Sequence, residues 1–174
     1  GKSGSNDANP EYMAEIRKII TEEDPLLREQ SVEVHRFGSS LHKLLDDMKV
    51  TMYHADGVGL AAPQVGILKQ VVVIDDREHD YIELVNPVIT EMKGSIQSTE
   101  FCLSVPDRGG RVKRARHIKV TAQDRNGNTF NYNVSGQLAI IFQHEIDHLH
   151  GILFTDVMSE EVSREQALRE AEED

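Results

Sequence analysis

The spacing of hydrophobic and polar residues changes along the chain and predicts helices at both ends of a β-rich centre. Over residues 39–52 apolar residues recur at the three- and four-residue spacing of one helix face. Ser39 or Ser40 can cap this helix, which we expect to end before Gly57. Its apolar face consists of Leu41, Leu44, Leu45, Met48 and Met52.

Short runs rich in β-branched and aromatic residues follow this helix and predict strands. The Asn126-Gly127 pair separates the last two runs and is typical of a tight hairpin turn, which joins antiparallel strands. The predicted strands cover residues 70–75, 81–85, 88–92, 117–123 and 129–134.

Two further helices are predicted in the C-terminal part of the chain. One starts near Ser135 and ends by Gly151, and the other covers the highly charged residues 159–172. The inward face of the first helix is formed by Leu138, Ile141, Glu145 and His148. This order of elements predicts an α+β fold, with short antiparallel strands around a central helix and a C-terminal helix.

The bulk composition is that of one globular domain. The chain has 174 residues, of which 39% are hydrophobic and 28% charged. We expect residues 13–174 to form a single catalytic domain, and the small, polar residues 1–12 to be a disordered tail or a cloning remnant.

Charge and cysteine content narrow the function further. A net charge of −11 argues against a dominant nucleic-acid site or an anionic membrane as partner, and no apolar run is long enough to span a membrane. Cys102 is the only cysteine, so a disulfide within the chain is excluded and a reducing compartment fits best.

The run Gln143-His144-Glu145-Ile146-Asp147-His148-Leu149 carries the most informative chemistry. On a helix, His144 and His148 lie one above the other and can bind one metal ion together. Glu145 is then placed to act as general base on a water at that ion. The structural alternative is an amphipathic helix that merely carries these residues.

Two histidines leave a catalytic metal site incomplete, because such sites usually have three protein ligands. Phe154 stands where an HExxHxxGxxH motif would place a third histidine. Asp156, Glu160 or Glu161 could supply a downstream carboxylate, without a supporting motif. Cys102 is the better candidate because a thiolate binds zinc or ferrous iron strongly, although a lone cysteine is often just a small buried hydrophobic residue.

Residues 57–66 are small and glycine-rich but do not form a nucleotide-binding loop, since they follow a helix and lack the GxGxxG spacing. Small residues here would instead let a substrate backbone approach closely. Gln64 could then offer an amide donor to that substrate.

Three motifs, taken in order, resemble those of the peptide deformylase family. The first reads Gly57-Val58-Gly59-Leu60-Ala61-Ala62-Pro63-Gln64, against the family pattern GxGLAAxQ. The second reads Glu100-Phe101-Cys102-Leu103-Ser104, against EGCLS. The third reads Gln143-His144-Glu145-Ile146-Asp147-His148-Leu149-His150-Gly151, against QHExDHLxG.

The resemblance implies a role for each matching residue. The implied metal ligands are Cys102, His144 and His148, and the implied catalytic acid/base is Glu145. Gln64 and the backbone N–H of Leu103 would bind the developing oxyanion. Val58, Ile140 and Ile141 would line a methionine pocket, and Gly59 would let the substrate backbone lie against the loop. Glu100 and Arg114 match a family pair that supports the cysteine segment. The alternative interpretation of this pair is an exposed ion pair that contributes little to stability.

The implied activity is metal-dependent hydrolysis that removes the N-formyl group from the initiator methionine of nascent polypeptides and releases formate. The implied cofactor is one divalent ion, with Fe²⁺ native in many bacterial members and Zn²⁺, Ni²⁺ or Co²⁺ as replacements. The implied partners are N-formylmethionyl peptides and nascent chains at the ribosome. We expect no membrane partner, and a location in a bacterial cytoplasm or an organellar matrix or stroma.

Phe101 is the clear departure from the family pattern, which has glycine at this position. A ring beside a metal ligand bears on substrate preference rather than on the chemistry.

Two other functions stay open at this point. A zincin-like metallopeptidase needs the same third ligand. A non-catalytic metal-binding module needs a fourth ligand, for which His54, His117 and His150 are available.

Overall fold

The described part of the chain, residues 13–173 of a computed structural model, forms two antiparallel sheets. The five-stranded sheet has the order β1-β2-β3-β6-β7, with strands Gly59–Ala61, Val71–Ile74, Ile82–Lys93, His117–Gln123 and Thr129–Ser135. The three-stranded sheet has the order β4-β5-β8, with strands Ile96–Cys102, Val105–Arg114 and Glu160–Val162. The prediction for residues 1–12 lies outside the described residues.

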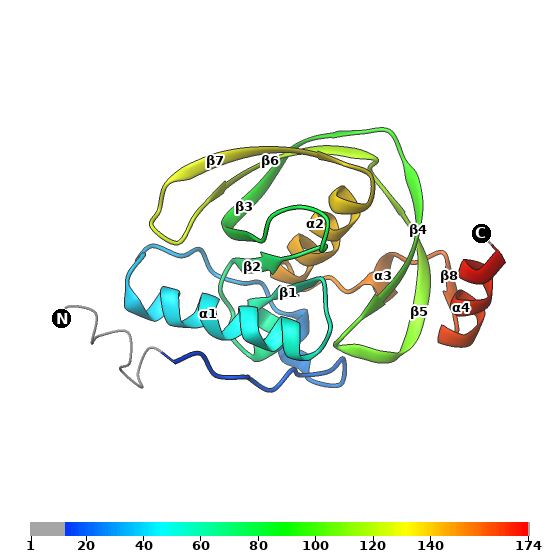
Figure 1. Ribbon diagram of the computed structural model, residues 1–174, viewed down its shortest axis with the longest axis horizontal. Coiled ribbons are helices and arrows are strands. Elements are labelled where there is room, and N and C mark those ends of the chain that lie inside the picture. The colour runs from blue at the N-terminus through cyan, green and yellow to red at the C-terminus, as the bar shows by residue number, and fades with distance from the viewer. Residues whose placement is uncertain (1–12, 174) are drawn as a thin grey trace.

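The helices pack around these sheets. They are α1 (Ser39–His54), α2 (Gly136–Leu149), α3 (Phe154–Val157) and α4 (Arg164–Glu173), with 3-10 helices at Pro25–Arg28 (η3) and Ala62–Val65 (η4). Figure 1 shows α2 at the centre of the molecule, beneath the curved strands β6 and β7. The α+β prediction, with antiparallel strands around a central helix and a helix at the C-terminus, is confirmed.

Strand β2 shows why the five-stranded sheet lies between two helices. All four of its residues are buried, and successive side chains of a strand point to opposite faces. Val71 and Val73 join a core cluster with α1, whereas Val72 and Ile74 join a cluster with α2. Strand β1, which begins at Gly59, pairs with β2 and is thereby held between the same two helices.

The predicted first helix is present, and its whole apolar face is buried. The predicted cap is wrong, because Gly38 occupies the capping position and no side chain there bonds to the helix backbone. Packing against the β2 valines therefore holds this helix in place, rather than a capping serine.

Helix α2 begins directly after Ser135, as predicted, but it is buried on nearly every face rather than on one. Its Gln143 fastens it to the β5–β6 connection. The Gln143 Oε1 accepts a hydrogen bond from Ala115 N at 3.0 Å, and Nε2 donates to Ala115 O at 2.9 Å. This pairing fixes α2 against backbone from a distant part of the sequence.

Two strand predictions need correction. The two strands predicted at residues 81–85 and 88–92 are one strand, β3, which begins at Ile82 and whose register shifts where Asn86 takes a positive φ of 53°. Strands β4 and β5 went unpredicted over most of their length, because turn residues such as Gly109 and Gly110 interrupt their pattern.

The predicted charged helix over residues 159–172 is also wrong at its start. Glu160–Val162 pairs with β5 as strand β8, and the helix begins only at Arg164. Buried Val162 is opposite Gly109, so pairing with β5 decides the conformation here.

Candidate active site

Helix α2 carries the two histidines one turn apart in the interior. Their ring centroids are 5.2 Å apart, and His144 and His148 are 8% and 1% exposed. Burial lowers the pKa of His148 well below its ordinary value, which keeps its ring neutral and able to bind a cation. The predicted placement of both rings on one side of the helix agrees with this geometry.

Cys102 comes to the same place from the end of β4. It pairs with Val105 across the turn into β5, after a register shift that ends the regular ladder. Its Sγ lies 3.4 Å from Nε2 of His148, and the ligand atoms of Cys102, His144 and His148 all lie within 4.8 Å of one another.

This donor set fits a divalent metal. Zinc–sulfur and zinc–nitrogen bonds at a tetrahedral angle place the two donor atoms about 3.6 Å apart, close to the separation of Cys102 and His148. One thiolate and two imidazoles suit zinc or ferrous iron, and three protein ligands leave a position for water or substrate. The site therefore has the composition of a catalytic metal site.

Glu100 orients His144 from the side away from the cysteine. Its Oε1 lies 2.8 Å from His144 Nδ1, which leaves the other ring nitrogen for a metal, an arrangement common around metal-bound histidines. Burial alone would raise the pKa of Glu100, but hydrogen bonds from Arg114 and His144 lower it to about 2. Burial alone would lower the pKa of His144, but the Cys102 sulfur and the Glu100 carboxylate outweigh burial and raise this pKa well above the ordinary value. A metal ion that binds this ring would therefore displace a proton from it.

Arg114 completes this support. Its Nε and Nη2 donate to the two oxygens of Glu100 at 2.8 and 2.7 Å, and its Nη1 donates to Asp147 Oδ2 at 2.7 Å. Arg114 and Glu100 are 7% and 5% exposed, so the interpretation of this pair as an exposed ion pair is wrong.

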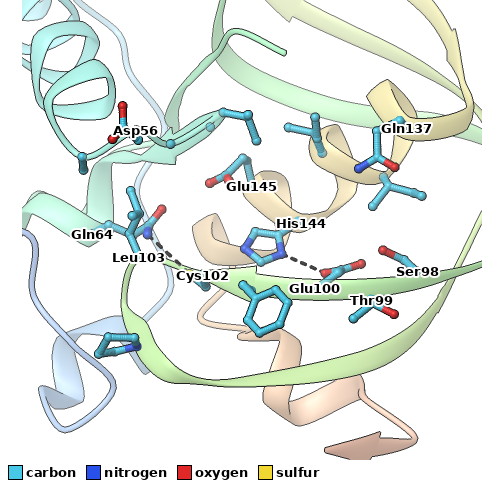
Figure 2. A pocket seen from close by; sticks show the side chains of 18 of the residues that line it. Asp56, Gln64, Ser98, Thr99, Glu100, Cys102, Leu103, Gln137, His144 and Glu145 are labelled. Carbon is cyan, nitrogen blue, oxygen red and sulfur yellow. Dashed lines mark hydrogen bonds and ion pairs between the residues drawn. The ribbon is translucent and has the colours of Figure 1, made fainter. Parts of the chain in front are cut away.

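Glu145 is a buried carboxylate that faces the cavity beside His144 (Figure 2). Burial raises its pKa to about 7, and within residues 13–173 its Oε1 has no hydrogen-bond partner. A Cβ on Gly59 would lie 2.6 Å from Oε2 of Glu145. Glycine is thus required there to make room for the carboxylate, a reason that the sequence did not suggest.

Gln64 approaches the cysteine from η4. Its Oε1 accepts a hydrogen bond from Ala61 N at 3.0 Å, which turns its Nε2 toward Ser104 Oγ at 3.1 Å and Cys102 Sγ at 3.6 Å. Figure 2 shows Gln64 and Glu145 bordering the same space, with Leu103 beside Gln64. The amide donor predicted from the glycine-rich segment therefore lies next to a candidate metal ligand, Cys102.

One cavity of about 540 Å³ unites these groups. Its lining includes every residue predicted to bind metal or substrate or to act in catalysis except His148, which is 1% exposed. The predicted pocket residues Val58, Gly59, Ile140 and Ile141 are all in this lining.

The rival ligands lie elsewhere. Asp156 pairs with Arg28, Glu160 with Arg111 and Glu161 with Arg108. His117 hydrogen bonds to Asn133 and His150 to Gln30. In the described part of the chain, the cluster around Cys102 contains no fourth protein ligand.

Sequence reasoning missed two supporting residues. Asp147 lies inside the HExxH run, but only the tertiary structure shows that it binds Arg114. Ser104, which accepts the Gln64 amide, is fully buried behind the cysteine.

The fold and this site are those of a hydrolase with a candidate metal site formed by one cysteine and two histidines. A family model described as polypeptide deformylase matches residues 16–164. The chain belongs to the polypeptide deformylase family. The peptide deformylase of Caldicellulosiruptor bescii is 54% identical over 151 residues, which cover 87% of this chain and 90% of that protein. The peptide deformylase of Heliobacterium modesticaldum is 52% identical, covering 81% and 93% of the two chains.

Solved structures agree with this assignment. Peptide deformylase from Thermotoga maritima superimposes with a TM-score of 0.81 at 38% identity, over 83% of this chain and 99% of that one. The class I type b peptide deformylase from Acinetobacter baumannii with Met-Ala-Ser bound has a TM-score of 0.80 at 34% identity, over 84% and 100%. None of the helices formed by residues 13–173 is long and apolar enough to cross a membrane.

Proposed function

We propose that this chain removes the formyl group from N-formylmethionine at the start of nascent polypeptides. Water is added across the formyl amide, the C–N bond breaks, and formate and a free amino terminus are released. The observation that supports this most directly is the convergence of the ligand atoms of Cys102, His144 and His148 beside the buried carboxylate of Glu145. Residues 13–174 would act as one catalytic domain.

Cys102, His144 and His148 would hold the divalent ion. When bound, such an ion polarises a carbonyl group and makes a water molecule more acidic. Fe²⁺ is our first candidate because a thiolate with two imidazoles suits it, and Zn²⁺, Ni²⁺ and Co²⁺ are the alternatives.

Glu145 would move the proton. Its unpartnered Oε1 accepts a proton from the attacking water and later gives it to the nitrogen of the leaving amine. Gly59 leaves the space that the carboxylate needs for this exchange.

Gln64 and the backbone N–H of Leu103 would bind the oxygen of the formyl group as it becomes negative. The Gln64 contact with Cys102 Sγ is long at 3.6 Å, so this N–H can turn to a substrate oxygen at little cost. One such donor typically stabilises the transition state by about 3–4 kcal/mol.

The cavity would hold the methionine side chain. Val58, Ile140 and Ile141 present apolar surface, and Gly59 leaves room for the substrate backbone. Strand β4 pairs only with β5 among the described strands, so its other edge can take a substrate peptide as an added strand. The formyl carbon carries only hydrogen, so a tight site admits it and rejects an acetyl group by steric exclusion.

The decisive test is formate release from formyl-Met-Ala-Ser by the anaerobically purified protein. We expect Glu145→Gln to lower kcat by about 100- to 10,000-fold while the metal content stays the same, since the proton acceptor is lost but the ligands remain. Glu165→Gln is the matched control, because Glu165 lies on α4 with its side chain 81% exposed. Near-normal turnover by Glu145→Gln would reject the assigned role.

The ligand set has its own test. We expect Cys102→Ala to bind much less than one equivalent of metal, measured by elemental analysis of the same preparation. His150→Ala removes an exposed histidine just past α2 and should keep full metal content. Equal metal content in the two variants would mean that Cys102 is a buried packing residue and not a metal ligand.

The source of the substrate is a further part of this proposal. Chains that begin with N-formylmethionine are made on ribosomes of bacteria and organelles, so we propose action on nascent chains in a bacterial cytoplasm or an organellar matrix or stroma. Co-sedimentation with translating ribosomes tests this, and its failure would leave the peptide chemistry intact.

A further inference from the structure

Phe101 lies on the face of β4 that does not carry the metal ligand. Glu100 and Cys102 are buried toward α2, and the intervening Phe101 is only partly buried on the other face. Its ring covers Gly109 of the neighbouring strand β5, where a Cβ would lie 2.7 Å from Cζ of the ring. The chain thus combines a large residue on β4 with the smallest residue beside it on β5, which leaves the ring a defined place.

Arg164, the first residue of α4, lies over this ring. Its guanidinium carbon is 4.8 Å from the ring centroid, and its Nη2 donates to Pro106 O at 3.3 Å. These two contacts hold the head group in a cation–π arrangement. Among the side chains described for residues 13–172, no carboxylate forms an ion pair with Arg164, in contrast to Arg108, Arg111 and Arg169, which each bind a glutamate.

Both side chains border the cavity that contains His144 and Glu145. A peptide added at the free edge of β4 turns successive side chains to opposite faces. When the methionine side chain points toward Ile140 and Ile141, the next side chain points to the face that carries Phe101 and Arg164.

We propose that Phe101 and Arg164 form a subsite for the side chain of the residue after methionine and that it favours an acidic residue. This inference rests on the proposed function. The held guanidinium has N–H groups left to donate to a carboxylate, whereas a lysine at the same position would be repelled.

The overall charge of the chain cannot account for a preference for acidic peptides. The whole chain has a net charge of −11, so it offers acidic peptides no general attraction. Asp56, an exposed acid of the cavity, comes from the connection after α1 and lies away from Thr99 of β4 (Figure 2). A preference for acidic peptides would therefore depend on Arg164.

The test compares kcat/KM for formyl-Met-Glu-Ser and formyl-Met-Lys-Ser at low salt. We expect the protein to prefer the glutamate peptide by about five- to tenfold, and Arg164→Gln to reduce this ratio to about one. A ratio that is the same before and after the substitution, or a preference for lysine in the unaltered protein, would overturn the proposal. A purely structural role of Arg164 would change both rates together and leave the ratio unchanged.

Two further variants separate the subsite from general charge effects. Arg169→Gln removes the same charge from the same helix at a side chain 64% exposed and paired with Glu165, and its ratio should match that of the unaltered protein. Phe101→Leu keeps bulk above Gly109 but removes the aromatic face, so its ratio should fall toward that of Arg164→Gln. An equal fall in Arg169→Gln would contradict the assignment.

Binding of the product peptides supplies a readout that needs no turnover. Calorimetry should show tighter binding of Met-Glu-Ser than of Met-Lys-Ser, with the difference lost in Arg164→Gln. If neither formyl peptide is hydrolysed, the proposed function fails, while this binding difference still decides the subsite.

Discussion

Two arginines on the same strand bind carboxylates in the same pattern but in very different surroundings. Arg114 binds Glu100 and Asp147, and Arg111 binds Glu160 and Glu170. An odd separation of three residues turns the two side chains to opposite faces of β5. Arg114 faces α2 and the candidate metal ligands and is 7% exposed. Arg111 faces α4 and is 21% exposed, with glutamate partners 59% and 39% exposed.

The comparison shows that burial, rather than the number of ion pairs, decides how much stability is lost when such a network is broken. A buried arginine that loses its partners, or a buried carboxylate that loses its arginine, is left as an uncompensated charge in a poorly solvating interior. An exposed pair that is broken regains water and loses little. The inner network can therefore hold His144 rigidly, whereas the outer one only positions α4.

The largest expected effect is at the inner network. Arg114→Leu leaves Glu100 and Asp147 without their cation, and we expect the free energy of unfolding to fall by about 3–5 kcal/mol. Because Glu100 orients His144, we also expect weaker metal binding. Urea unfolding and metal titration of the same preparation measure both.

Arg111→Leu is the matched control for this variant, because it removes the same group from the same strand. Equal losses of unfolding free energy in the two variants would show that burial does not determine how much each arginine network stabilises the fold.

An intermediate effect is expected at Asp47 on α1, whose carboxylate is buried but whose partners are half-exposed. Asp47 accepts hydrogen bonds from Glu15 N at 2.8 Å and Arg17 Nε at 2.9 Å and pairs with Lys43. We expect Asp47→Asn to lower the free energy of unfolding by about 1–3 kcal/mol at neutral pH, since a buried charged partner is lost.

The pH dependence of this effect follows from the direction of the shift. Burial alone would raise the pKa of Asp47, but the bonds from Glu15, Arg17 and Lys43 lower it below its ordinary value of 3.8. A lowered pKa stabilises the fold above that value, and the stability is lost as the pH falls through the folded pKa. Unfolding curves of both proteins at decreasing pH should converge below about 3.8. A difference that stays constant as the pH falls further below that value would contradict the assignment.

The smallest effect is expected at the outer network. Arg111→Leu should change the free energy of unfolding far less than Arg114→Leu, because water replaces the lost partners. Hydrogen exchange should nevertheless become faster in α4, whose contact with β5 includes the pair between Arg111 and Glu170. Unchanged exchange would mean that other contacts, such as Arg164 on Phe101, hold the helix alone.

Sequence patterns predicted the elements whose packing follows one period. The first helix kept its predicted face because every member packs against one sheet. The pattern failed over β4, β5 and β8, where glycines, charges and single apolar residues follow no period. Pairing between distant segments fixes these strands, and no local window contains that information.

Part of the candidate site could likewise be predicted from the sequence, and part could not. The three motifs marked the candidate metal ligands, Glu145 and Gln64 through their order and spacing. A separation of four residues on a helix places the two histidines on one face whatever the surroundings. The sequence could not show that Gly59 makes room for Glu145 or that Asp147 shares an arginine with Glu100, since these contacts join separate segments.

The sequence by itself determined the chemical groups of this protein: two histidines one turn apart with a carboxylate between them, a lone thiol, an amide donor, and an acidic overall charge. Only the tertiary structure decided which of its ion pairs are buried and at which glycines a side chain would clash. It also decided that Arg164 contacts Phe101 on the face of β4 opposite to Cys102. Spacing along one helix is fixed by backbone geometry, whereas burial and cross-strand contacts depend on how every segment packs against every other.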